Sequence, residues 1–224
     1  MIRSYSMSPQ MKSLGFDSAV VAEIRDVSIS QSDPELEKLK EDAAAKIMQM
    51  GEEEIESNRI LQSYRNTVKK TGRSAKNFPP AAESLIRLVK FRGRFPPINA
   101  AVDAYNLISA KYFLALGVHD IDKLEGPITF RLSEGNEPFT AVGSDKRKMT
   151  AKGDYLYSDS KQVLAWLDSK DSDAVKLSTD TKNILVVIMG TDATPIDYNL
   201  SAAKEACELI VKFNKGDYEI LRVD

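Results

Sequence analysis

The pattern of apolar and polar positions centres on the stretch from Phe95 to Gly126. Within it, apolar side chains recur at i, i+3 and i+4 spacing, which predicts a helix with one buried face: Val102, Tyr105, Ile108 and Tyr112. Pro96 and Pro97 would start this helix rigidly, and Gly117 would end the helical region.

Two polar residues, Asp103 and Asn106, lie one helical turn apart among these apolar positions. Because buried polar groups need partners, we expect both side chains to be at least partly buried. We also expect them to form hydrogen bonds with the backbone or with the segment around residues 171–181. The helix is therefore predicted to anchor another part of the molecule.

Helical spacing dominates before this stretch, and strand-like alternation follows it. A half-buried edge strand is expected at Ala19–Ile24. One helix is expected from Asp33, and a second is expected to begin at Ser57 or in the acidic run before it and to end at Gly72. A third helix is expected at Ala81–Phe91. Later strands are expected at Ile128–Leu132, Phe139–Val142, Asp154–Tyr157, Val163–Leu167, Val175–Leu177 and Ile184–Met189. A helix at Asn199–Asn214 precedes a short terminal strand. Strands grouped after helices indicate the α+β class.

Length and composition fit an ordinary globular protein. At 224 residues with 42% hydrophobic content, the chain can bury a full core as one domain, or as one domain with a helical extension. No apolar run approaches the roughly 20 residues that span a bilayer, and the polar N-terminus lacks the apolar segment of a signal peptide. We therefore expect a cytoplasmic protein without a membrane partner. The sequence indicates no oligomeric state.

The sequence offers few groups for cofactor or catalytic chemistry. The single Cys207 excludes an internal disulfide and is expected to be a small buried residue, and one Cys with one His cannot form a clustered zinc site. His119 is expected in a polar turn, as a structural or exposed residue. Because the motifs of phosphate-binding loops, dinucleotide folds, serine hydrolases and zinc proteases are missing, we expect no metal and no cofactor.

Positive charge is concentrated in one segment, although the net charge of the chain is only −2. Residues 57–94 hold ten Lys or Arg residues and a single acid, Glu83. Such a segment can present a basic face to phosphates, and it can equally be a solvated helix face. The candidates for RNA binding are Arg65, Lys69, Lys70, Arg73 and Lys76.

Two separated motifs resemble a known family. The first is Val102-Asp103-x-x-Asn106 followed by Asp120-x-Asp122-Lys123-Leu124-Glu125-Gly126, and the second is Leu164-Ala165, Asp171-Ser172 and Thr181-x-Asn183-Ile184-Leu185. Together they resemble the editing, tRNA-binding domain of the phenylalanyl-tRNA synthetase β subunit, its fused third and fourth modules. The likeness covers roughly residues 80–195. The other modules of the synthetase do not fit in this length, so the resemblance implies a free-standing relative.

The resemblance implies a layered, β-rich core of mostly antiparallel or mixed sheets with flanking helices. Residues 80–224 would form the editing-like domain, and residues 1–79 would add an N-terminal strand and a helical extension packed on the same core. By motif matching, Asn106 takes the place of the family's site Asn and Asp171 that of its acid. Tyr105 replaces a Thr of the family, and Gly117 falls where the family has a His.

The family's small Gly-rich run before the acid is replaced by Trp166-Leu167-Asp168. A Trp and a Tyr at these places would fill or reshape the pocket. The candidate substrate-binding residues are Asp103, Tyr105, Asn106, Trp166, Asp171 and Ser172, and no residue is assigned as catalytic.

Three functions follow as alternatives. The chain could hydrolyse mischarged aminoacyl-tRNA in trans, as a second sieve where pocket fit alone discriminates too weakly. It could bind tRNA or another RNA without catalysis. It could also retain the pocket for a free amino acid or a related small metabolite.

Overall fold

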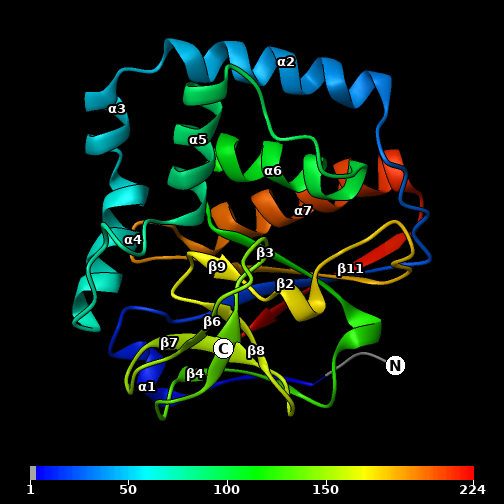
Figure 1. The fold of residues 1–224 in the computed structure, drawn as a ribbon. Helices are drawn as coiled ribbons and strands as arrows, with labels where there is room; N and C mark the ends of the chain where they lie inside the picture. Colours follow the sequence, from blue (N-terminus) through cyan, green and yellow to red (C-terminus); the bar gives the residue numbers. More distant parts are fainter. Residues whose placement is uncertain (1–3) are drawn as a thin grey trace.

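A computed structural model describes residues 4–224 and confirms the α+β class, with most of the helices above two stacked sheets (Figure 1). The helices are α1 (Pro9–Lys12), α2 (Pro34–Gln49), α3 (Glu52–Ser57), α4 (Arg59–Lys70), α5 (Ala81–Arg92), α6 (Ala100–Tyr112) and α7 (Ile196–Asn214). The strands are β1 (Tyr5–Met7), β2 (Ala19–Arg25), β3 (Leu116–Asp120), β4 (Ile128–Leu132), β5 (Pro138–Thr140), β6 (Arg147–Met149), β7 (Tyr155–Ser158), β8 (Val163–Trp166), β9 (Lys170–Asp171), β10 (Ile184–Met189) and β11 (Asp217–Val223). No helix of the described residues has the length and apolar character to cross a membrane.

The middle layer is an antiparallel sheet in the order β11-β2-β10-β3. Its strand β10 is continuously apolar because both of its faces are covered. Ile184 and Val186 face the helices, whereas Leu185, Val187 and Met189 face the second sheet, as the period of two requires. The expected central strand at Ile184–Met189 is confirmed.

The expectation of an edge strand at Ala19–Ile24 was wrong. Strand β2 lies between β10 and β11, and all residues from Ala19 to Ile24 are buried. The C-terminal strand β11 pairs with β2 along its whole length and so removes the edge.

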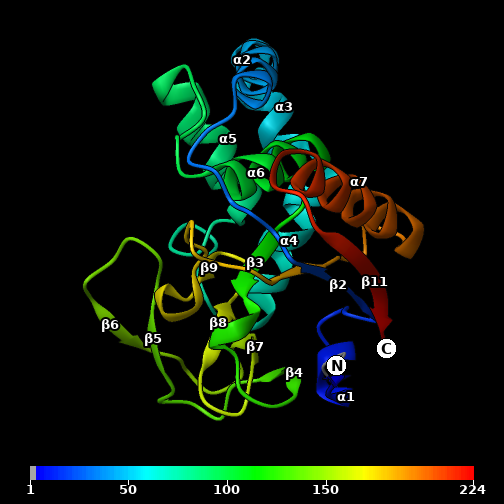
Figure 2. The ribbon, with the colours of Figure 1, turned by 90° about the vertical axis from the view of Figure 1, so that its right-hand side faces the viewer.

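The second sheet has the order β1-β4-β7-β8-β9 and is mixed, because β1 runs parallel to β4 while the other neighbours are antiparallel. It packs against the face of the middle sheet that the helices leave open. A separate two-stranded ribbon of β5 and β6 projects to one side of the body (Figure 2).

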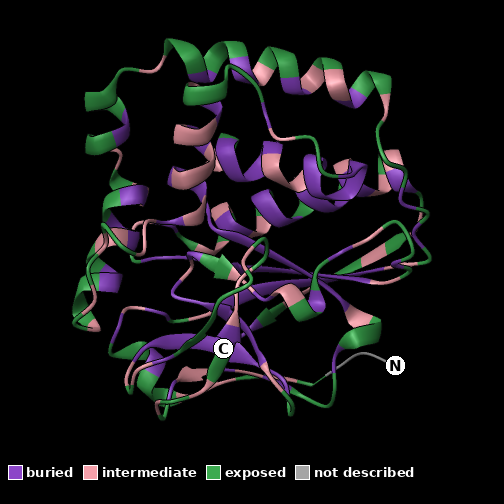
Figure 3. Ribbon diagram, in the orientation of Figure 1, coloured by how far each residue is buried: buried purple, intermediate pink, exposed green. Residues whose placement is uncertain are grey.

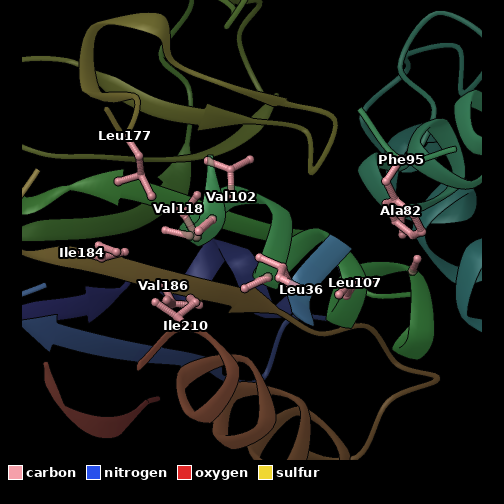
Figure 4. Close-up of a cluster of buried hydrophobic side chains, with 14 of the residues drawn as sticks. Leu36, Ala82, Phe95, Val102, Leu107, Val118, Leu177, Ile184, Val186 and Ile210 are labelled. Carbon is pink, nitrogen blue, oxygen red and sulfur yellow. The ribbon is translucent and has the colours of Figure 1, made fainter. Parts of the chain in front are cut away.

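Helices α2, α5, α6 and α7 cover the other face of the middle sheet, with α2 outermost (Figures 1 and 2). Asp33 caps α2 as expected, accepting hydrogen bonds from the N–H groups of Glu35 and Leu36. Figure 4 shows side chains of this core from helices and sheet together, among them Leu36, Val102, Leu107, Val118, Ile184, Val186 and Ile210. Helix α6 and strands β2, β3, β7, β8 and β10 are mostly buried, whereas much of α2 and α3 is exposed (Figure 3).

The segment before residue 80 contributes to the same core as the segment after it, since Leu36 and Ile55 share a cluster with Val102 and Ile210. Where a domain boundary lies remains a prediction.

Several local expectations need correction. Gly117 does not end the central helix: α6 ends at Tyr112, Phe113 takes a left-handed conformation (φ 55°), and Gly117 lies inside β3. The helix expected up to Gly72 is two helices, the second capped by Asn58. The strand expected at Val175–Leu177 is instead a short 3-10 helix at Asp173–Val175.

A candidate site between the two sheets

Strand β3 forms one edge of the middle sheet and carries the site on its inner face. Successive residues of a strand point to opposite faces. Val118 packs with the helices, so Gly117 and His119 turn toward the second sheet. Tyr157, Ala165 and Asp171 face them from that sheet, aligned by the pairings of Tyr157 and Asp171 with Ala165.

A small cavity of about 60 Å³ opens here. Its lining comes from the segment before and within β3, from β7, β8, β9 and β10, from the β8–β9 turn and from the start of α5: Ala81, Ala115, Leu116, Gly117, Tyr157, Ala165, Asp168, Ser169, Lys170, Asp171, Val187 and Met189. A water molecule takes about 30 Å³ of liquid, and ligand pockets for drug-sized molecules start near 300 Å³. The cavity therefore admits a group of only a few atoms.

Gly117 lets three polar side chains converge. A Cβ built on it would overlap the Tyr157 hydroxyl oxygen, and it would lie 3.2 Å from Asp171 Oδ1 and 3.3 Å from His119 Nε2. The Tyr157 hydroxyl thus occupies the space that a side chain at position 117 would need.

His119 is buried inside β3, so the expectation of a polar turn was wrong. Its Nε2 lies 2.7 Å from the Tyr157 hydroxyl, and its Nδ1 is buried without a hydrogen-bond partner among the described residues. Burial lowers the pKa of His119 to about 3, because the charged imidazolium would lose its hydration. The ring is therefore neutral at physiological pH.

Two carboxyl groups border the cavity, that of Asp168 in the β8–β9 turn and that of Asp171 in β9. Burial raises the pKa of Asp171 to about 7, although the N–H of Val118, at the free edge of β3, donates a hydrogen bond to the carboxylate. Burial also raises the pKa of Asp168 well above its usual value, and the charge of Asp171 adds to this. A hydrogen bond with the Tyr155 hydroxyl opposes this shift in the pKa of Asp168.

The turn that carries Asp168 has an unusual backbone. Leu167 and Asp168 have φ values of 56° and 46°, in the left-handed region that favours glycine. The Asp168 carbonyl accepts a hydrogen bond of 2.9 Å from the N–H of Ala81 at the start of α5. Strain of this kind costs about 1–3 kcal/mol per residue and often occurs at functional sites.

Of the residues suggested by the sequence, Asp171 lines the cavity. Tyr105 lies close enough to Asp171 for the Asp171 charge to affect its pKa. Burial, and then the charge of Asp171, raises the pKa of Tyr105 well above its usual value. Ser172 is buried next to Asp171, and its N–H donates to the carbonyl of Leu164.

Asp103 and Asn106 lie apart from the cavity lining. The Asp103 carboxylate is buried, bonded to Lys40 Nζ at 2.6 Å and to the N–H of Ile98 at 3.1 Å, so it joins α6 to α2. Asn106 is half-buried, and its side chain forms no hydrogen bond with the rest of residues 4–224. Neighbouring helix residues point about 100° apart, so Asn106 and Tyr105 point in different directions.

Trp166 lies on the opposite face of the second sheet from Ala165 and is absent from the described lining. Its Nε1 donates to Asp154 Oδ2 at 2.9 Å, and its ring packs edge-on against Phe78 and Phe139. Arg73 binds both oxygens of Asp154 at 2.7 Å. Asp154 therefore holds Trp166 and Arg73 together.

The remaining RNA-binding candidates differ in their contacts. Arg65 pairs with the buried Glu83 at 2.8 Å, and Lys70 donates to the carbonyl of Leu14 at 3.1 Å. Lys69 and Lys76 are exposed. No cluster of His, Cys, Asp and Glu suited to a metal ion occurs in the described part of the chain.

Comparison with known proteins identifies the family. The family model described as "B3/4 domain" matches residues 63–217, which is more than half of the chain. The chain belongs to the B3/4 domain family. The match extends beyond the range of roughly 80–195 suggested by the motifs.

Similar proteins include phenylalanine–tRNA ligase β subunits. The subunit of Fusobacterium nucleatum is 30% identical over 92 residues, covering 41% of this chain and 11% of the subunit. That of Bifidobacterium longum is 25% identical over 171 residues, covering 73% of this chain and 20% of the subunit. The chain thus matches at most about a fifth of these relatives' length.

The fold is also similar to that of an N-terminal fragment of the phenylalanyl-tRNA synthetase β subunit from Pyrococcus horikoshii. The match has a TM-score of 0.54 at 16% identity and covers 100% of this chain and 52% of the fragment. It supports the fold expected from the resemblance: a layered core of mixed and antiparallel sheets with flanking helices.

Sequence patterns did not point to Tyr157 or Asp168 as site residues. Tyr157 reads as an ordinary strand residue in YLYS, and only the pairing of β7 with β8 brings it opposite Gly117. Asp168 follows Leu167 in a turn without glycine, so its left-handed conformation has no sequence signal.

Proposed function

We propose that this chain binds the aminoacylated 3′ end of a tRNA and hydrolyses the ester of a small, hydroxyl-bearing amino acid attached to it. The observation that carries the proposal is the Asp171 carboxyl, whose pKa is raised to about 7 in a cavity of about 60 Å³. A carboxyl group with a pKa near 7 is ionised in a large fraction of the molecules at physiological pH, and the ionised form can accept a hydrogen bond from a ligand hydroxyl. The family relationship to tRNA ligase subunits supports tRNA as the carrier.

The size of the cavity supports selection of a small side chain. It accommodates a methyl or hydroxymethyl group and excludes an aromatic ring. The Asp171 carboxylate accepts a hydrogen bond from the hydroxyl of a serine or threonine side chain. A side chain without this hydroxyl leaves the carboxylate with the Val118 N–H as its hydrogen-bond donor and adds no donor of its own, which disfavours its binding.

The neutral His119 and the Tyr157 hydroxyl supply the polar contact for the reacting ester. With its proton on Nε2, the imidazole donates to the Tyr157 oxygen, and the hydroxyl hydrogen of Tyr157 is free to reach an ester carbonyl. This tautomer leaves an acceptor, rather than an N–H, unpaired at Nδ1. Acceleration then comes from orientation and hydrogen-bond donation, not from a strong base.

A test follows the deacylation of several mischarged tRNAs with the wild-type chain, with Asp171→Asn, and with Asp173→Asn. Asp173 is a matched control because it lies in the same segment, outside the cavity, and pairs with Lys176. We expect faster hydrolysis of seryl and threonyl esters with the wild type and the control, and a loss of about 100-fold or more with Asp171→Asn. Decay of every ester at its spontaneous rate would refute the hydrolytic function.

A second candidate is the binding of a free small molecule without hydrolysis. It is favoured by Gly117: the resemblance places a His of the family at this position, where this chain has no side chain and the Tyr157 hydroxyl fills the space. Isothermal titration with free serine and threonine distinguishes the two functions: binding together with spontaneous ester decay would favour this candidate.

A further inference from the structure

The ribbon of β5 and β6, residues 138–149, forms an arm beside the candidate site; we call it the β5–β6 arm. Its ladder pairs Pro138 with Met149, Phe139 with Lys148, and Thr140 with Arg147. Phe139 is buried against Trp166 and anchors the arm to the body. Paired residues share a face, so Arg147 and Met149 lie on the face opposite Phe139, whereas Lys148 lies on the face of Phe139. All three residues are exposed.

The arm is joined directly to the segment that carries Asp171. The N–H of Val142 donates to the Asp171 carbonyl at 2.9 Å, and Ala141 forms an isolated bridge with Ser172. In Figure 2 the arm projects from the body on the side of β8 and β9. An extended polymer bound along the arm would therefore run toward the cavity.

The cations of the arm are exposed and unpaired. Lys146, Arg147 and Lys148 are exposed and form no ion pair with other described residues, and the arm has a single acid, Asp145. In the basic segment, by contrast, Arg65, Arg73 and Arg87 are bound to carboxylates of the chain. An unpaired cation can bind a phosphate without first breaking an ion pair.

Apolar groups accompany these cations. Val142 and Met149 are 52% and 48% exposed; Met149 directly follows the basic run and Val142 lies four residues before it. Lys170, which lines the cavity and is exposed, continues the positive charge toward the site. Cationic and apolar side chains on one arm suit a single-stranded nucleic acid, which offers both phosphates and base faces.

We propose that the β5–β6 arm binds the single-stranded RNA that leads into the Asp171 cavity. Lys146, Arg147 and Lys148 hold its phosphates, and Val142 and Met149 contact its sugars or bases. The inference rests on the proposed function for the identity of the RNA. An acidic polypeptide would satisfy the charges, but it has no terminal ester to place in the cavity.

The test compares a triple variant of the arm, Lys146→Gln, Arg147→Gln and Lys148→Gln, with a control, Lys46→Gln, Lys182→Gln and Lys204→Gln. The control removes the same charge from exposed positions outside the arm. Binding of fluorescently labelled, unfractionated tRNA is measured from about 50 to about 200 mM salt. The arm variant should lose about 2 from the slope of log K against log salt, and the control should keep the wild-type slope.

The other results separate the arm from the hydrolytic function. If the wild-type chain binds tRNA and the arm variant has the same salt slope as the wild type, the proposed role of the arm is wrong and the hydrolytic function is unaffected. Binding that depends on the arm without any ester hydrolysis would support the arm and refute only the hydrolytic function. If the wild-type chain binds no tRNA at low salt, both the role of the arm and the hydrolytic function are wrong. If poly-aspartate displaces the labelled tRNA as efficiently as single-stranded RNA of equal charge does, the arm binds acidic polypeptides instead.

Discussion

Replacing Gly117 with alanine tests the packing on which the site depends. The new methyl carbon would overlap the Tyr157 hydroxyl oxygen, whereas non-bonded atoms need about 3.5 Å. The Tyr157 ring cannot swing aside easily, because it is buried and packs against the rings of His119 and Phe130 at centroid distances of 5.4 and 5.2 Å. We expect Gly117→Ala to lower the free energy of unfolding by about 1–3 kcal/mol, the usual cost of overpacking.

A double-mutant cycle identifies the cause of that loss. Tyr157→Phe removes the overlapping oxygen and its hydrogen bond to His119, and alone it should cost about 0.5–1.5 kcal/mol. In Gly117→Ala/Tyr157→Phe the alanine should cost far less than it does alone, giving a coupling of about 1 kcal/mol or more. Urea unfolding measures all four states, and Gly51→Ala, with no atom within 4 Å of its new carbon, is the control. Additive losses, or a neutral Gly117→Ala, would refute this packing.

Three further outcomes are expected. Ester hydrolysis should rise as the pH passes through about 7, because the Asp171 carboxylate is the form that accepts a hydrogen bond, and a pH–rate profile of Asp171→Asn should lack this rise. Lys40→Met should lower the free energy of unfolding by about 3–5 kcal/mol, because it leaves the buried Asp103 carboxylate without its ion pair. In urea unfolding, the double variant Lys40→Met/Asp103→Leu should recover most of this loss. Asn106→Leu should change the melting temperature little, because its side chain has no hydrogen bond to lose among the described residues; a loss above about 1 kcal/mol would contradict this placement.

Local signals predicted most of the helices and the central strand. The Asp33 cap and Pro34 fixed the start of α2, and the apolar run of Ile184–Met189 predicted β10. The predictions were wrong where pairing between strands far apart in the sequence decided the structure. β2 reads as an edge strand in the sequence, and it is central because β11, almost two hundred residues later in the chain, pairs with it.

The site was predicted only in part for the same reason. Motif matching pointed to Asp171, which lines the cavity, and the sequence could not show that β7 would bring Tyr157 above Gly117. Trp166 carries a large side chain in the right segment, but strand alternation turns it to Asp154, on the face away from Ala165. His119 was read as a turn residue because its flanking aspartate is polar; that aspartate is itself buried, bonded by Thr181 at 2.8 Å.

The most direct test of the central claim compares seryl, alanyl and tyrosyl esters on one and the same tRNA. The cavity admits the first two side chains by size, and only the seryl group pairs with Asp171. Single-turnover hydrolysis by the wild-type chain should therefore be fastest for the seryl ester, slower for the alanyl ester, and indistinguishable from spontaneous decay for the tyrosyl ester. Equal acceleration of all three, or preference for the tyrosyl ester, would contradict a small hydroxyl-selective site at Asp171.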